Sequence, residues 1–151
     1  MAGQSLLVRS DDNSITGKDT LKGKKVCSVT GSTPIQRVRD QGLTDQIVEF
    51  QTYSQCVDQL LAGQVDAVTT DDAILKGFAA QQPDRLKLVG ETFSTEPYGI
   101  GLKKDDTDFR NFINDSLEKA NQDGRYKKAW DSTAGKIPNA KLPAMPAIQR
   151  Y

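Results

Sequence analysis

Residues 24–38 read KKVCSVTGSTPIQRV, and the fold class follows from this stretch. The apolar run at 25–29 predicts a strand, and Pro34 predicts the first turn of a helix, with Thr33 as the cap before it. Between strand and helix lies the turn Gly31-Ser32-Thr33. A turn of small residues in this place can hold an anion or can be only a tight corner, and its own residues favour the corner.

Strands and helices alternate on both sides of this stretch. Strands are expected at residues 5–9, 25–29, 47–50, 65–69, 86–89 and 97–103, and helices at 34–40, 53–62, 71–81, 106–121 and 125–130. The alternation over residues 25–90 predicts an α/β fold with a mostly parallel sheet that is flanked by helices on both faces. Residues 136–151 contain three prolines and no periodicity, so we expect an extended tail that wraps around the protein or hangs free.

The amino-acid composition argues against several classes of function. The 151 residues suit one domain with a sizeable core. Twenty basic residues balance twenty acidic ones, so no strong field favours binding to nucleic acid. The sequence has no histidine, which excludes Ser-His and Cys-His catalysis and most zinc sites. The residues therefore call for neither a metal nor a cofactor.

Cys27 and Cys56 are the two cysteines of the sequence. Their number alone makes a disulfide and a pair of buried thiols about equally expected. If they are bonded, the bridge closes a loop of about 30 residues and contributes roughly 3 to 4 kcal/mol in the chain-entropy model.

Two loops stand where an α/β sheet binds its ligands, at the carboxyl ends of strands. Residues 30–33 and 69–72 each follow a predicted strand and open a predicted helix. The first loop offers N–H and hydroxyl donors at a helix N-terminus, which suits a carboxylate or a phosphate. In the second, Asp71 taken alone is an ordinary helix cap, and Asp72 is expected to face solvent. Together, donors from one loop and a carboxylate from the next suit a zwitterion such as a free amino acid.

Four longer motifs make the sequence resemble a known family. They read LKGKKVCSVTGSTP, LLAGQVDAVTTDDAIL, PYGIGLKKDD and GRYKKAWDSTAG, and nearly the whole chain takes part. The chain resembles the amino-acid-binding proteins of ABC importers, a solute-binding family that shares its architecture with the ligand cores of ionotropic glutamate receptors. The resemblance implies a periplasmic-binding-protein-like lobe.

The resemblance also implies the residues that contact the ligand. They are Thr30, Gly31, Ser32, Thr33, Thr70 and Asp71. In this assignment Ser32 and Thr33 donate hydrogen bonds to the ligand carboxylate, and Gly31 allows a close approach. Asp71 accepts the α-ammonium group, while the two remaining threonines set the selectivity for the ligand's side chain.

Family proteins close two α/β lobes over an amino acid. By resemblance, residues 1–9 and 95–103 are the crossing segments between lobes, 10–94 the second lobe, 104–135 helices of the first lobe, and 136–151 the tail. The family's carboxylate-binding arginine precedes the first crossing, so we expect Met1 to begin a fragment that binds ligand weakly or not at all. The helices after Asp106 would then dock on the remaining lobe, form a non-native dimer with another chain, or stay mobile.

The function implied is that of a substrate-binding component, without catalysis or a cofactor, that works with an ABC importer's membrane permease. Glutamate is the expected ligand, with glutamine and aspartate open. Such proteins work outside the cytoplasmic membrane, in the periplasm or at the cell surface as lipoproteins. Disulfides persist there, so the resemblance favours a Cys27–Cys56 bridge.

Two other classes of function stay open. One is an enzyme of the same two-lobe fold, such as a dehydratase, with Asp71 or Glu96 as acid or base. The other is a ligand-sensing module of a receptor or kinase. The lack of histidine and of any nucleophile beside a base argues against the enzyme.

Overall fold

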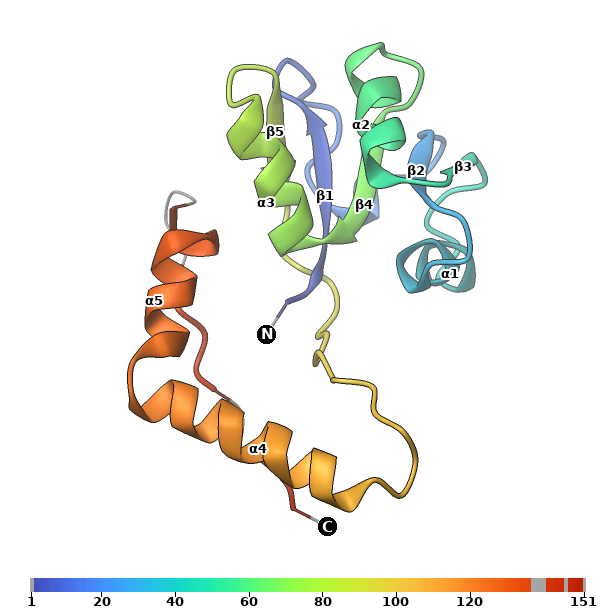
Figure 1. Cartoon of the computed structure of the whole chain (residues 1–151). Coiled ribbons are helices and arrows are strands. Elements are labelled where there is room, and N and C mark those ends of the chain that lie inside the picture. The colour runs from blue at the N-terminus through green and yellow to red at the C-terminus, as the bar shows by residue number, and fades with distance from the viewer. Residues whose placement is uncertain (1, 137–140, 146, 151) are drawn as a thin grey trace. The chain divides into compact units, whose positions relative to one another are not determined.

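The computed structural model describes residues 2–136, 141–145 and 147–150. The chain divides into two compact units, Met1–Pro97 and Tyr98–Tyr151. The first, which we call the sheet unit, contains all the strands of the described residues (Figure 1). The second, which we call the helical unit, contains two α-helices and the described part of the C-terminal tail.

One sheet organises the sheet unit. Its described strands, in spatial order, are β3 (Ile47–Phe50), β2 (Val26–Val29), β4 (Ala67–Asp71), β1 (Gln4–Arg9) and β5 (Leu86–Val89). Strand β2 pairs in parallel with β3 and β4, whereas β1 pairs antiparallel with β4 and β5. Four strands therefore run in one direction and only β1 opposes them. The expected mostly parallel sheet is confirmed, with β1 making it mixed.

Helices cover both faces of this sheet, because successive side chains of a strand point to opposite faces. Leu7 and Val68 pack with α2 (Tyr53–Leu61) and α3 (Asp72–Gln81) in one core cluster. Leu6 and Ala67 pack with α1 (Thr33–Asp40) in a second cluster on the opposite face. A short 3-10 helix (Lys18–Thr20) lies in the loop between β1 and β2. The flanked α/β sheet expected from the sequence is confirmed (Figure 1).

The strand directions create one edge that matters for function. Strands β2, β3, β4 and β5 all end at the edge where β1 begins, which we call the carboxyl edge. Helices α1, α2 and α3 follow β2, β3 and β4 directly, so all three begin at this edge. The N-terminus of a helix carries a partial positive charge and unpaired N–H groups. The carboxyl edge therefore favours an anion.

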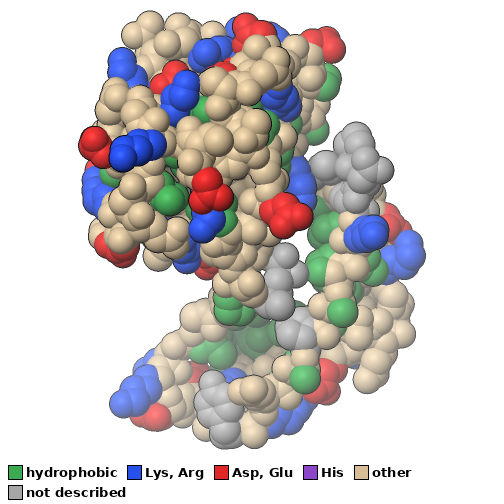
Figure 2. All heavy atoms as spheres, turned by 180° about the vertical axis from the view of Figure 1, so that it is seen from behind, with side chains coloured by type: hydrophobic (Ala, Val, Ile, Leu, Met, Phe, Trp, Pro, Cys, Tyr) green, Lys and Arg blue, Asp and Glu red, His purple; other side chains and the backbone are tan. Residues whose placement is uncertain are grey.

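The helical unit has a different character. Helices α4 (Thr107–Gln122) and α5 (Arg125–Ser132) contain no buried residue, and a 3-10 turn (Ala134–Lys136) follows them. Phe109 and Phe112 stack on one another with 46% and 62% of their surface exposed. Figure 2 shows hydrophobic side chains on the surface of this unit, and mixed positive and negative charge on the sheet unit. No helix in the described residues has the length and apolarity needed to cross a membrane.

The described part of the tail lies along its own unit. The hydroxyl group of Tyr126 on α5 donates a hydrogen bond to the Pro143 carbonyl oxygen at 3.1 Å. Arg150 forms ion pairs with Asp115 and Glu118 on α4, at 2.7 and 2.9 Å. Residues 141–145 and 147–150 have no regular secondary structure. The extended tail that wraps or hangs free stays a prediction. The rest of the tail lies outside the described residues.

The prediction of a strand at residues 97–103 is wrong. These residues have no regular secondary structure, and Tyr98 and Ile100 have 73% and 58% of their surface exposed. A strand needs a partner to accept its hydrogen bonds, and none of the described strands pairs with this segment. Gly99 and Gly101 further raise the entropy cost of an extended conformation.

Strand β4 also differs from the expectation. It was expected at 65–69 but runs from Ala67 to Asp71. Its carboxyl end is extended by antiparallel pairing with β1, in which Gln4 lies opposite Asp71. That partner is more than sixty positions away in the sequence, so local residue patterns do not reveal the pairing.

Candidate functional site

The turn after β2 is closed by its own backbone. The Ser32 N–H donates to the Val29 carbonyl oxygen at 3.1 Å, and Gly31 has φ of 72°. This positive φ is the left-handed conformation that glycine adopts without steric cost, as the third residue of such a turn requires. A Cβ at Gly31 would meet no atom within 4 Å, so space lies open beside the turn.

The backbone N–H groups of this turn and of the start of α1 differ in whether they already have an acceptor. The amides of Thr30 and Ser32 are already bonded, to Phe50 and Val29. The described structure records no acceptor for the amides of Thr33 and Ile35. The turn therefore supplies fewer free N–H groups than the sequence suggested, but the helix N-terminus keeps its own.

The helix cap of α1 is Ser32, not Thr33 as expected, because Thr33 already has helical geometry. The Ser32 side chain makes no capping hydrogen bond. Its hydroxyl oxygen instead lies 3.4 Å from the hydroxyl oxygen of Ser28 on β2. The first turn of α1 thus lacks the side-chain acceptor that usually satisfies its N–H groups.

Asp71 ends β4 and stands at the N-cap position of α3. The sequence left open whether it is an ordinary cap. Its side chain makes no capping hydrogen bond, and the residue is only partly buried. The carboxylate is therefore held at the carboxyl edge by the backbone of β4, without being used to cap its own helix.

The expectation that Asp72 faces solvent is wrong. Its side chain is 16% exposed and pairs with Lys76 one turn along α3. Its Oδ1 accepts the Gly3 N–H at 3.2 Å, while its own N–H donates to the Gly3 carbonyl oxygen at 2.8 Å. Burial opposes ionisation of Asp72, but the bonds from Lys76 and Gly3 outweigh it and hold the pKa of this carboxyl below its usual value.

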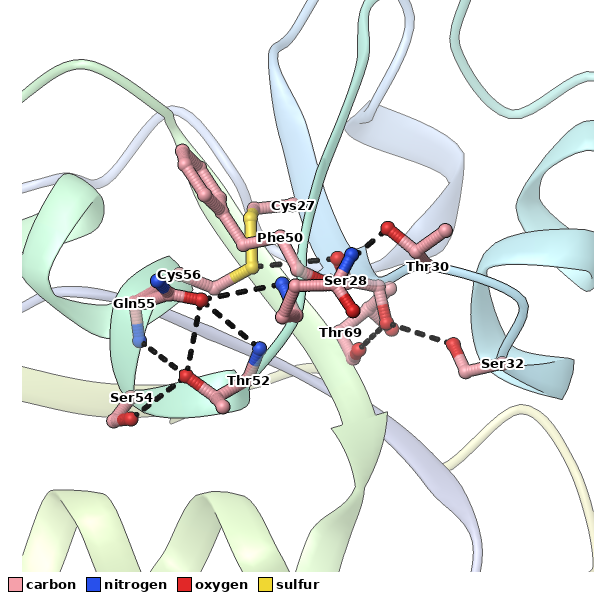
Figure 3. The surroundings of a disulfide bond; sticks show 11 residues. Cys27, Ser28, Thr30, Ser32, Phe50, Thr52, Ser54, Gln55, Cys56 and Thr69 are labelled. Atoms are coloured by element: carbon pink, nitrogen blue, oxygen red, sulfur yellow. Dashed lines mark hydrogen bonds between the residues drawn. A yellow bond between two sulfur atoms is a disulfide. The ribbon is translucent and has the colours of Figure 1, made fainter.

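The two loops lie next to one another because β2 and β4 are adjacent parallel strands. A hydrogen bond of 2.7 Å from the Ser28 hydroxyl to the Thr69 carbonyl oxygen joins the strands just before their loops (Figure 3). Thr70 differs from the other expected ligand contacts, because only 2% of its surface is exposed. Its role in ligand selectivity stays a prediction, as does the role of each of the other five residues.

The disulfide between Cys27 and Cys56 is present, with a Cα–Cα distance of 5.7 Å. It joins β2 to α2 and is fully buried. Figure 3 shows it beside Phe50. The bridge therefore fixes α2 to the strand that carries the Gly31 turn, as the resemblance predicted.

Sequence reasoning missed two residues at this edge. Thr52 caps α2, where its side chain accepts the Gln55 N–H, and the Gln55 side chain accepts the Thr52 N–H in return. Thr followed three residues later by Gln is the sequence signature of such a capping box and could have been recognised. Gln4, at the start of β1, is fully buried, and only its polarity next to the apolar run at residues 6–8 could have drawn attention to it.

Comparison with known proteins identifies the fold. No protein-family model matches the chain. The structure of an ancestral arginine-binding protein bound to glutamine is similar, with a TM-score of 0.80 and 38% identity, over 89% of this chain and 60% of that one. The fold is therefore that of the periplasmic-binding-protein-like, amino-acid-binding proteins.

A search for relatives by sequence finds proteins that are named as amino-acid-binding proteins. A glutamate-binding protein of Corynebacterium efficiens is 45% identical over 138 residues, which are 87% of this chain and 47% of that protein. An ABC transporter glutamine-binding protein of Bacillus subtilis is 40% identical over 129 residues, or 85% of this chain and 47% of the relative. The chain thus spans about half the length of the curated relatives it matches.

Proposed function

We propose that this chain carries the second ligand-binding lobe of the substrate-binding component of an ABC amino-acid importer. The ligand is glutamate or a similar polar amino acid, glutamine or aspartate. The observation that carries the proposal is the pairing of two loops at one edge, an uncapped helix N-terminus after β2 and the Asp71 carboxylate after β4. Homology to glutamate- and glutamine-binding proteins supports the same class.

The binding chemistry follows from the residues at that edge. A ligand carboxylate would accept hydrogen bonds from the N-terminus of α1 and from the hydroxyls of Ser32 and Thr33. A helix N-terminus stabilises an anion by about 0.3 to 1 kcal/mol when exposed and up to about 2 kcal/mol when partly buried. The Asp71 carboxylate would pair with the α-ammonium group. Gly31 would let the ligand approach, and Thr30 and Thr70 would contact its side chain.

No catalysis belongs to this proposal. The named relatives are binding proteins, and the chain lacks histidine, the commonest general base. Glu96, the other acid considered from the sequence, forms an ion pair with Arg37 at 2.9 Å. That pairing serves a structural role better than proton transfer, since the guanidinium stabilises the ionised carboxylate.

The partner and location belong to the same proposal. A membrane permease of an ABC importer would receive the ligand. The buried Cys27–Cys56 disulfide supports a location outside the cytoplasmic membrane, where disulfides persist. Attachment as a lipoprotein at the cell surface and residence in the periplasm both fit this location.

Calorimetric titration tests the proposal, with the chain produced together with any flanking sequence that its gene encodes. L-Glutamate should bind, and Asp71→Ala should weaken binding at least about 30-fold, because truncation leaves the ligand's ammonium group without its charged partner. Asp58→Ala, which removes an exposed carboxylate on α2, is the matched control and should bind normally. No heat with glutamate, glutamine or aspartate, or full affinity in Asp71→Ala, would refute the proposal.

A further inference from the structure

Gln4 is a buried polar residue that the ligand-binding proposal does not use. Its side chain is fully buried, and every hydrogen-bonding group of its amide has a partner. The amide nitrogen donates to the Pro34 carbonyl oxygen and to the Thr69 hydroxyl oxygen, both at 3.0 Å. The amide oxygen accepts a hydrogen bond from Arg37 at 2.5 Å. Gln4 thus connects β1, β4 and two turns of α1.

A short antiparallel pairing lies where the sheet unit ends. Residues 2–4 run beside residues 93–96, and we call these two segments the end pair. The Glu96 N–H donates to the Ala2 carbonyl oxygen at 2.8 Å, and the Phe93 N–H donates to the carbonyl oxygen of residue 4 at 2.9 Å. The second segment stops next to the last residue of the sheet unit.

Arg37 joins the end pair to α1. Its Nη2 lies 2.9 Å from the Glu96 carboxylate, while its Nη1 donates to Gln4. The side chains of Arg37 and Glu96 are 26% and 25% exposed, so about three quarters of each is shielded from water. An ion pair in such surroundings is screened less by solvent than one on the open surface.

Polar contacts also lead from Gln4 in the other direction, toward the Gly31 turn. Thr69, which accepts from Gln4, donates its hydroxyl hydrogen to the Ser5 carbonyl oxygen at 2.8 Å. The backbone carbonyl of Thr69 accepts from Ser28, and the Ser28 hydroxyl meets the Ser32 hydroxyl (Figure 3). A continuous set of polar contacts therefore runs from the end pair to the cap residue of α1.

The same helix offers a comparison. Arg39, two residues after Arg37, forms an ion pair with Glu49 on β3, and its side chain is 41% exposed. Arg39 contacts neither the end pair nor the first turn of α1 in any recorded hydrogen bond or ion pair of the described residues. An exposed pair of this kind contributes about 0 to 1 kcal/mol and fixes little geometry.

We propose that Arg37 and Gln4 are positioning residues that set the orientation of the first turn of α1 and couple it to the end pair. This inference rests on the proposed function, because that turn is the proposed carboxylate site. Gln4 holds the Pro34 carbonyl in the first turn, and Arg37 holds the following turn to Glu96. A carboxylate that orders the turn thereby stabilises the end pair, and by linkage the end pair stabilises binding equally.

Amide hydrogen exchange without ligand tests the positioning claim. Arg37→Met should make the amides of Phe93 and Glu96 exchange about tenfold faster, the factor for losing one charge-assisted hydrogen bond. Arg39→Met is the matched control on the same helix and should change these rates less than about twofold. Equal rates in the two variants would overturn the proposal.

A second variant perturbs the coupling from the opposite end. A Cβ at Gly3 would lie 2.5 Å from the Ser94 carbonyl oxygen, so Gly3→Ala should force the end pair apart. The amide chemical shifts of Thr33 and Ile35 should then move, although the recorded hydrogen bonds of Gly3 go to Asp72 and not to either residue. The control is Gly77→Ala, because an added Cβ there meets nothing within 4 Å. Unmoved α1 resonances in folded Gly3→Ala would contradict the coupling.

Titration with L-glutamate separates this inference from the proposed function. If the proposed function holds, Arg37→Met should weaken binding about tenfold at a temperature where it is folded, and Arg39→Met should bind normally. Normal affinity in Arg37→Met would overturn the positioning role. If the wild type does not bind L-glutamate, the proposed function fails, and the exchange and chemical-shift measurements still decide whether α1 and the end pair are coupled.

Discussion

At the scale of single residues, Asp72 is a carboxylate that the sequence predicts to be exposed but that makes structural contacts in the fold. It accepts the Gly3 N–H and pairs with Lys76, so it connects the start of β1 to the start of α3. The motif TTDDA contains two adjacent carboxylates, and nothing in the motif distinguishes them. Only their positions after β4 decide that Asp71 stays partly open while Asp72 turns toward β1.

Acid should remove the contribution of Asp72 to stability. Its pKa in the folded state lies below the ordinary value of 3.8, so the carboxylate stabilises the fold above about that pH, and this contribution is lost as the pH falls through the folded-state pKa. Asp72→Asn should therefore cost roughly 1 to 2 kcal/mol at pH 7 and progressively less as the pH falls below the ordinary pKa of 3.8. Urea unfolding at several pH values measures this. Asp58→Asn is the exposed control, and a pH-independent loss in Asp72→Asn would contradict the assignment.

At the scale of elements, the disulfide connects the strand of the Gly31 turn to α2. The double variant Cys27→Ala/Cys56→Ala should lower the free energy of unfolding by about 3 to 4 kcal/mol, because the 29-residue separation then no longer restricts the unfolded chain. Urea unfolding of the variant and of the oxidised wild type measures the difference. A titration of the denatured wild type that finds two free thiols would show that the bridge does not form.

Most elements of the sheet unit were predictable from local sequence. The strands and helices between Lys25 and Val89 follow from apolar periodicity, from Pro34 at a helix start and from Gly63 at a helix end. The errors concern pairing. Residues 97–103 have a strand-like composition but no partner, and β4 is longer than its pattern because β1 lies beside it.

At the scale of the whole molecule, the two units differ in how they are stabilised. Both described core clusters lie in the sheet unit, whereas α4 and α5 contain no buried residue. Helices without a buried face gain little from tertiary packing and depend mainly on their own hydrogen bonds and propensities. The difference should be visible in local opening of the native state.

Hydrogen exchange measured by mass spectrometry on this 151-residue chain tests the difference. Amides of α4 and α5 should exchange at least about 100-fold faster than those of β1, β2 and β4, because opening the helices exposes no core. Peptides from α3, a helix packed on the sheet, provide the internal control. Equal protection of α4 and β4 would show that the helical unit gains burial that this fold does not provide.

Only part of the proposed site could be predicted from the sequence, because some of its contacts join segments that are distant in the chain. The Gly31 turn and Asp71 are found from their positions after strands, and the family resemblance assigns them to a ligand. The roles of Gln4 and Arg37 could not be found in this way. Their partners come from β4, from α1 and from the segment after β5, and no local spacing brings these together.

The alternation of strands and helices, the glycine turn and the acidic loop can be predicted from the sequence, because these features depend on residues close together in the chain. The tertiary structure alone decided that β1 runs against its neighbours, that Asp72 contacts Gly3 and Lys76, and that Arg37 lies between Gln4 and Glu96. Those features depend on contacts between distant segments. Such contacts exist only once the sheet has assembled, so their energies leave no local pattern in the sequence.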